Sequence, residues 1–174
     1  MQDPALPHPG RPRDAIHEEI PLATTEQQPT FQIEKIYVKD LSFELPNAPQ
    51  VFVQGENPQL EIQVRNDAQQ FAEALYEVVV TVTVTARVKE RTLFLAEAAQ
   101  AGIFSLRGIP ADDLAPLLGI ACPNILYPYV REAISDLVTR GGFPPVLLAP
   151  VSFEALYAQR AQAEAGQPRV EIAS

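Results

Sequence analysis

The chain has 174 residues, with 13 Lys and Arg against 22 Asp and Glu, so its formal net charge at pH 7 is −9. This balance argues against a nucleic-acid binder, because such proteins need clustered basic side chains to hold the phosphate backbone. The only histidines are His8 and His17, and the only thiol is Cys122. We therefore expect no nucleophilic catalytic system, no metal or cofactor site and no internal disulfide, which fits a reducing compartment such as the cytoplasm.

The chain is predicted to form one folded domain between two tails. Residues 1–30 hold six of the seventeen prolines and have the composition of a disordered tail. They contain no apolar run of the length found in signal peptides, and no run of about 18 apolar residues occurs elsewhere, so we expect no membrane insertion. Residues 31–164 should form the domain, and residues 165–174 a flexible C-terminal tail.

Four strands are predicted from alternating apolar and polar residues. They span residues 31–45, 59–65, 76–88 and 91–105. Ile36 and Val38 interrupt the alternation of the first strand, which indicates a bulge or partial cover of its polar face. The short turn at Lys89-Glu90 predicts that the third and fourth strands are antiparallel neighbours.

The fourth strand has no clearly polar face. One face carries Phe94, Ala96, Ala98, Gln100 and Phe104, and the other carries Leu95, Glu97, Ala99 and Ile103. An antiparallel sheet usually leaves one face in water, so this strand needs cover from elsewhere. The alternation alone leaves two interpretations open: a central strand under a loop, or a strand at a subunit interface.

Helical periodicity follows the strands. Asp112 and Asp113 suit the start of a helix, and Gly119 is expected to end it. An apolar stripe at residues 126–138 indicates a longer amphipathic helix, and a last helix begins after the expected N-cap Ser152. Strands followed by helices predict an α+β domain, with helices on one side of a four-stranded antiparallel sheet.

Carboxylates and aromatic side chains are the remaining functional candidates. Asp40 and Glu44 share a strand face about 13 Å apart, which is too far for a glycosidase pair. They form either a solvated face or an acidic docking patch. The acids Asp112 and Asp113 are interpreted as helix-capping residues, and an enzyme using them alone is disfavoured. Aromatic residues near loops and helix ends either fill the core or line a groove for extended polypeptide.

Several segments together resemble SecB, a family of bacterial protein-export chaperones. The resemblance extends from about residue 31 to residue 157, and its segments keep the family's order. The segments are 36–44, 46–49, 76–79, 102–104, 122–132, 140–145 and 148–151.

The resemblance implies a four-stranded antiparallel sheet with helices, assembled as a dimer of dimers. It implies an ATP-independent holdase in the cytoplasm that binds unfolded precursor proteins and delivers them to the SecA ATPase for export. The alternative is a SecB-like general or antitoxin-associated chaperone without SecA docking. Neither nucleic acid nor direct membrane insertion is expected.

The resemblance also assigns roles to residues by position. The zinc-bearing C-terminal tail of SecA would dock on Asp40, Glu44, Leu95 and Glu97. The client groove would be lined by Phe43, Phe52, Tyr127, Phe143, Phe153, Leu156 and Tyr157. The oligomer interface would include Ala96, Ala98, Gln100, Tyr129, Ala133, Ile134 and Leu137.

Overall fold

The structure is a computed structural model that describes residues 28–53, 55 and 57–165. Apart from residues 28–30 and 165, the expected terminal tails lie outside the described residues. The elements are, in chain order, β1 (Thr30–Glu44), the 3-10 turn η1 (Gln50–Val53), β2 (Gln59–Ala72), β3 (Leu75–Val88), β4 (Arg91–Arg107), α1 (Ala111–Pro116), the π-helical turn η2 (Leu117–Ala121), α2 (Cys122–Arg140) and α3 (Phe153–Ala165).

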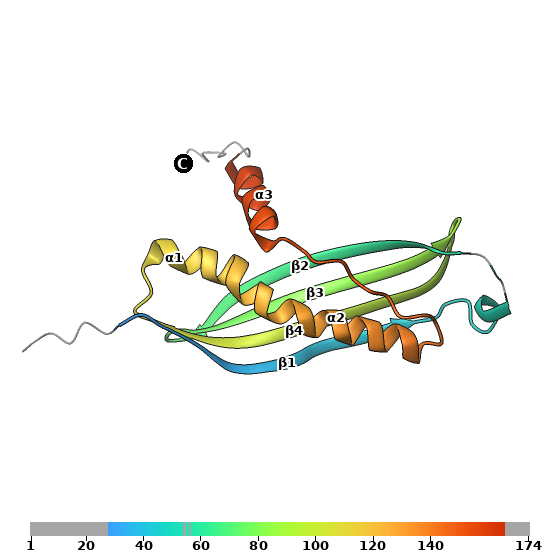
Figure 1. Cartoon of the computed structure of the whole chain (residues 1–174), viewed down its shortest axis with the longest axis horizontal. Coiled ribbons are helices and arrows are strands. Elements are labelled where there is room, and N and C mark those ends of the chain that lie inside the picture. Colours follow the sequence, from blue (N-terminus) through green and yellow to red (C-terminus); the bar gives the residue numbers. More distant parts are fainter. Residues whose placement is uncertain (1–27, 54, 56, 166–174) are drawn as a thin grey trace, which may run out of the picture.

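The four strands form one antiparallel sheet in the order β1-β4-β3-β2. The prediction of a four-stranded antiparallel sheet packed with helices is confirmed. The Val/Thr-rich β3 and the Ala-rich β4 occupy the centre, while β1 and β2 are the edges. The long helix α2 lies across one face of the sheet, and α3 projects away from the sheet (Figure 1).

The pairing of β1 with β4 explains the irregular alternation in β1. Register shifts fall between Ile33 and Lys35 and between Val38 and Asp40. Each shift moves the following residues by one position relative to β4, so that Ile36 pairs with Gly102 and Leu41 with Ala98. Ile36 and Leu41 therefore share one face although their numbers differ in parity, and the expected bulge is confirmed.

The core lies between α2 and the two central strands. Alternate valines of β3 face the helix and are fully buried, as are Leu126, Val130, Ile134 and Val138 on α2. These four positions form the predicted apolar stripe. Close approach is possible because β4 carries glycine at position 102, where an added Cβ would lie 3.0 Å from the Leu126 side chain.

The helical path runs without a break from α1 through η2 into α2. The prediction that Gly119 ends a helix is wrong, because Gly119 lies inside η2. A Cβ at this position would lie 2.5 Å from Cδ2 of Tyr157, so glycine serves close packing here rather than helix termination. Asp112 and Asp113 lie in the first turn of α1, where they suit the helix dipole, but neither forms a side-chain cap.

Helix α3 begins where the sequence predicts. The Ser152 hydroxyl oxygen accepts a hydrogen bond from the backbone N–H of Ala155 at 3.2 Å, which confirms Ser152 as the N-cap. Arg160 attaches the helix to the sheet by donating to the carbonyl oxygen of Asn66 in β2 at 2.9 Å.

Several residues expected at an oligomer interface lie in the core of the protomer instead. Ala96, Ala98, Gln100 and Ile134 are at most 5% exposed, because α2 of the same chain covers that face of β4. The cover required by this face of the strand is therefore an intramolecular helix. The other three expected interface residues all lie on α2: Ala133 and Leu137 are partly buried and Tyr129 is exposed.

Candidate functional site: an acidic sheet face and an apolar helix-bearing face

The sheet face opposite α2 brings the four expected docking residues together. Ala96 and Ala98 point at the helix, so the alternating residues Leu95 and Glu97 point to the other face. Glu44 of β1 pairs directly with Leu95 of β4, while Asp40 pairs with Ala99, the next residue of the same face after Glu97. We call the surface formed by Asp40, Glu44, Leu95 and Glu97 the acidic surface.

The acidic surface combines exposed charge with one apolar side chain. Asp40 and Glu44 are exposed, and Leu95 and Glu97 are partly buried. The hydroxyl of Thr83 on β3 donates to Oε2 of Glu97 at 2.6 Å and so orients this carboxylate. Carboxylates gathered on one face attract a cationic partner, and the apolar Leu95 at one end of the surface offers it a dry contact.

A polar cluster on the same face was not anticipated from the sequence. The Glu77 carboxylate of β3 accepts hydrogen bonds from the Tyr37 hydroxyl, from Nζ of Lys39 at 2.7 Å and from Nε2 of Gln69 at 2.7 Å. Tyr37 and Lys39 belong to β1, which is separated from β3 by β4. They reach across because Tyr37 pairs with Ala101, a residue too small to block the path.

Hydrogen bonding shifts the titration of two members of this polar cluster. The Lys39 ammonium and the Tyr37 hydroxyl stabilise the ionised Glu77 carboxylate and lower its pKa. The hydrogen bond to Glu77 raises the pKa of Tyr37 to about 12. Glu77 is therefore a carboxylate and Tyr37 a neutral donor at physiological pH.

The helix-bearing face gathers three of the expected groove residues at the C-terminal end of α2. The Phe94 ring lies 5.5 Å from that of Phe43 and 4.8 Å from that of Phe143, and Phe52 lies 5.4 Å from Phe143, measured between ring centroids. Phe52 is half exposed, at 51%. Phe94, which the prediction omitted, is the buried centre of this aromatic cluster.

The remaining expected groove residues lie around α3. The Tyr127 hydroxyl donates to the carbonyl oxygen of Ala149 at 2.6 Å, and its ring meets that of Phe153 edge to face at 5.7 Å. Phe153 is fully buried, so it supports the surface from beneath. Leu156 and Tyr157 are partly buried on the same helix. The seven residues thus form two groups rather than one continuous wall.

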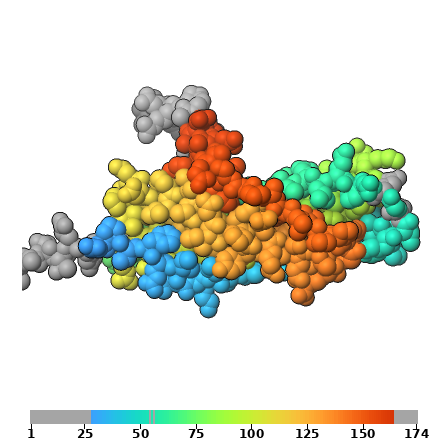
Figure 2. Space-filling view, in the orientation of Figure 1, coloured from blue at the N-terminus to red at the C-terminus, as the bar shows by residue number. Residues whose placement is uncertain are grey.

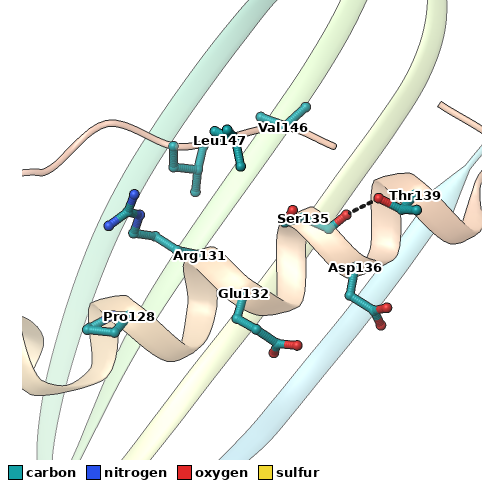
Figure 3. A pocket seen from close by; sticks show the side chains of 9 residues that line it. Pro128, Arg131, Glu132, Ser135, Asp136, Thr139, Val146 and Leu147 are labelled. Atoms are coloured by element: carbon teal, nitrogen blue, oxygen red, sulfur yellow. Dashed lines mark hydrogen bonds between the residues drawn. The ribbon is translucent and has the colours of Figure 1, made fainter. Parts of the chain in front are cut away.

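The extended segment 144–152 joins these two groups and runs beside α2. A groove of about 440 Å³ lies between this segment and α2 (Figure 3). Val146 and Leu147 of the segment stand opposite Arg131 of α2. Leu147, which the sequence analysis did not single out, is 81% exposed. The groove is lined by Pro128, Arg131, Glu132, Ser135, Asp136, Thr139, Val146, Leu147 and Leu148.

The edge strands leave two apolar stripes uncovered, because α2 packs mainly on β3 and β4. Figure 2 shows parts of both edge strands on either side of the helix. Exposed apolar area of this kind marks binding surfaces more often than isolated apolar side chains do. The stripes consist of Phe31, Ile33, Val38 and Leu41 on β1, and Leu60 and Ile62 on β2.

The described residues contain no group of three or more His, Cys, Asp or Glu side chains that could hold a metal ion. No helix in this part of the chain is both long and apolar enough to cross a bilayer. Cys122 is fully buried, and burial raises the pKa of its thiol to about 12.

An antiparallel sheet with an acidic open face and an apolar helix-bearing face suits a protein that binds other polypeptides. Residues 24–164 match the family described as "Preprotein translocase subunit SecB". The chain belongs to the SecB family of protein-export chaperones. It is accordingly a cytoplasmic chaperone and not an enzyme, as the resemblance implied.

Individual relatives support the assignment. The chain is 59% identical over 143 residues to the protein-export protein SecB of Methylobacillus flagellatus, covering 82% of this chain and 91% of the relative. It is also 59% identical over 143 residues to that of Chromobacterium violaceum, covering 81% and 95%. A solved SecB-like chaperone of Mycobacterium tuberculosis, in complex with an antitoxin peptide, shares the fold with a TM-score of 0.58 and 18% identity, covering 70% of this chain and 90% of that one.

Proposed function

We propose that this chain is an ATP-independent holdase that keeps unfolded precursor proteins competent for export. The observation that carries the proposal is the apolar helix-bearing face, where Leu147 is exposed on the groove along α2 and Phe52 is exposed against Phe143, beyond the C-terminal end of the helix. Such a surface binds many sequences through adaptable apolar contacts, and it requires no acid, base or metal. Binding to the unfolded state alone holds the client there by mass action.

The holdase activity is tested with a slowly folding precursor and no nucleotide. The chain should suppress light scattering from the aggregating precursor at roughly stoichiometric concentration. The variant Phe52→Ser/Leu147→Ser should suppress it less, because it removes exposed apolar area without opening the core. Gln63→Ser, an exposed polar substitution on the opposite face, is the control. Unhindered aggregation in the presence of the wild-type chain would contradict the proposal.

We also propose that the acidic surface docks the zinc-bearing C-terminal tail of SecA. Three carboxylates extend from Leu95 along β1 and β4 and suit a cationic partner, and they lie on the face opposite the proposed client surface. A chaperone built this way can hold a client and its delivery partner together. The zinc in this proposal is carried by SecA.

Asp40→Ala/Glu44→Ala should abolish SecA binding in calorimetry and leave client binding intact. The matched control is Glu61→Ala/Asp67→Ala, which removes the same charge from the same face on β2, a strand separated from β1 by β4 and β3. Unchanged SecA affinity in the first variant would reject the docking assignment. It would favour a general or antitoxin-associated chaperone.

We propose that protomers assemble as a dimer of dimers through the β1 side of the helix-bearing face, which leaves the groove beside segment 144–152 open to clients (Figure 1). The exposed apolar stripe on β1 and the exposed Tyr129 on α2 lie on this face. No strand among the described residues pairs with the outer edge of β1, so its backbone groups are available to a second copy.

A further inference from the structure

A lysine is adjacent to the acidic surface. The register shift between Val38 and Asp40 makes Lys39 the extra residue of a bulge, so Lys39 and Asp40 project from the same side of the sheet. The flexible stem of a lysine would allow an unrestrained ammonium to approach the neighbouring Asp40 carboxylate. That approach would neutralise part of the surface that a cationic partner must meet.

The structure directs this lysine elsewhere. Nζ of Lys39 lies 2.7 Å from Oε2 of Glu77, with the two side chains 45% and 9% exposed, respectively. Glu77 is itself held by hydrogen bonds from Tyr37 and Gln69, which come from the two edge strands. The carboxylate is thus a fixed, nearly buried acceptor that draws Lys39 across β4 and away from Asp40.

We propose that Glu77 is a positioning residue for partner docking: by holding the Lys39 ammonium across β4, it keeps the acidic surface free of an internal cation. Glu77 need not touch the partner, and its own charge is balanced by Lys39. The pair therefore adds no net charge to the face, whereas Lys39 alone would add one positive charge beside Asp40. This inference rests on the proposed docking of the SecA tail.

The test compares four full-length variants by calorimetry with the zinc-loaded SecA tail peptide at low salt. Glu77→Gln should weaken binding by about three- to fivefold, as expected for one exposed charge contact. Glu61→Gln removes the same charge from the same face without releasing a lysine, and should change binding by less than about twofold. Lys39→Gln should bind as tightly as wild type or more tightly. Lys39→Gln/Glu77→Gln should restore wild-type affinity.

Losing Lys39 as well also removes the unpaired ammonium that Glu77→Gln leaves in the fold, so rescue by the double variant is interpreted together with the salt dependence of binding. The loss of binding affinity caused by Glu77→Gln should also become smaller at about 0.5 M salt, where exposed charges are screened. If the double variant stays weak, or if Glu61→Gln is as weak as Glu77→Gln, the inference is overturned. If Asp40→Ala/Glu44→Ala binds normally, the docking proposal fails too. If Asp40→Ala/Glu44→Ala loses binding but Glu77→Gln does not, the docking proposal stands and only the inference about Glu77 fails.

Discussion

At the residue scale, close contacts depend on side chains that are absent or small. The Phe43 ring lies directly over Gly141, in the space that a Cβ would occupy. In the same way, Ala101 on β4 leaves room for Tyr37 to reach Glu77. Neither role follows from the residue type, because glycine after a helix usually signals only its end.

Gly141→Ala should therefore destabilise the fold. The added Cβ must displace the Phe43 ring, which stacks on Phe94, and overpacking of this kind costs about 1–3 kcal/mol. The measurement is the denaturation midpoint in urea at fixed protein concentration. Gly55→Ala is the control, because an added Cβ there meets no atom within 4 Å. Equal midpoints for the two variants would contradict the packing argument.

Glu77 should make the fold sensitive to acid. Its pKa is lowered from the ordinary value of 4.5 in the folded state, so its stabilisation is complete above that value. The stabilisation is lost as the pH falls through the lower folded pKa. In urea titrations below pH 4.5, the free energy of unfolding should fall less steeply for Glu77→Gln than for the wild type. Parallel curves would show that the carboxylate is not stabilised in the fold.

At the element scale, α3 depends on a few attachments. Its contacts are mainly with the π-helical turn η2, where Tyr157 lies over Gly119. Arg160 adds one hydrogen bond to β2 and Ser152 caps the first turn. By contrast, α2 buries a continuous apolar stripe against the sheet. The two helices should therefore differ in local stability.

Gly119→Ala should loosen α3 without harming α2. Alanine favours a helix by about 1 kcal/mol over glycine, yet its Cβ would lie 2.5 Å from the Tyr157 ring. Hydrogen exchange should therefore show faster exchange of the α3 amides, while the α2 amides serve as the internal control. Unaltered α3 protection would mean that Tyr157 does not anchor the helix.

At the scale of the whole molecule, the two faces of the sheet have different surroundings. One face carries α2 and still exposes apolar residues along both edge strands. The other carries the acidic surface and the polar cluster around Glu77. This division supports the proposed assembly, in which the apolar stripe of β1 on the helix-bearing face meets a second copy and the acidic faces stay in water.

Light scattering should give a mass near four times 19.1 kDa. Leu41→Lys should shift the protein to smaller species, because it places a charge in the exposed apolar stripe of β1. Gln63→Lys adds the same charge to the opposite face of the sheet and should leave the mass unchanged. A wild-type monomer at micromolar concentration would contradict the proposed assembly.

Local patterns were sufficient for the type and order of the four strands and the longer helices, and for the family resemblance. Alternation identified the strands, the i, i+4 apolar stripe identified α2, and Ser152 marked the start of α3, because these signals act between residues close in sequence. Local propensity did not reveal the full length of β2. Its second half, residues 66–72, is rich in poor strand formers and is extended by pairing with β3.

Only the tertiary structure decided what covers each face. Alternation says which side chains point the same way, but not which element packs on them, so Ala96 and Ala98 could equally have met a second subunit. Ala96 and Ala98 are buried under α2, and Lys39 reaches Glu77 across an intervening strand. Both features depend on contacts between residues that are distant in the sequence. Such contacts arise when the sheet assembles, and no periodicity within a single strand encodes them.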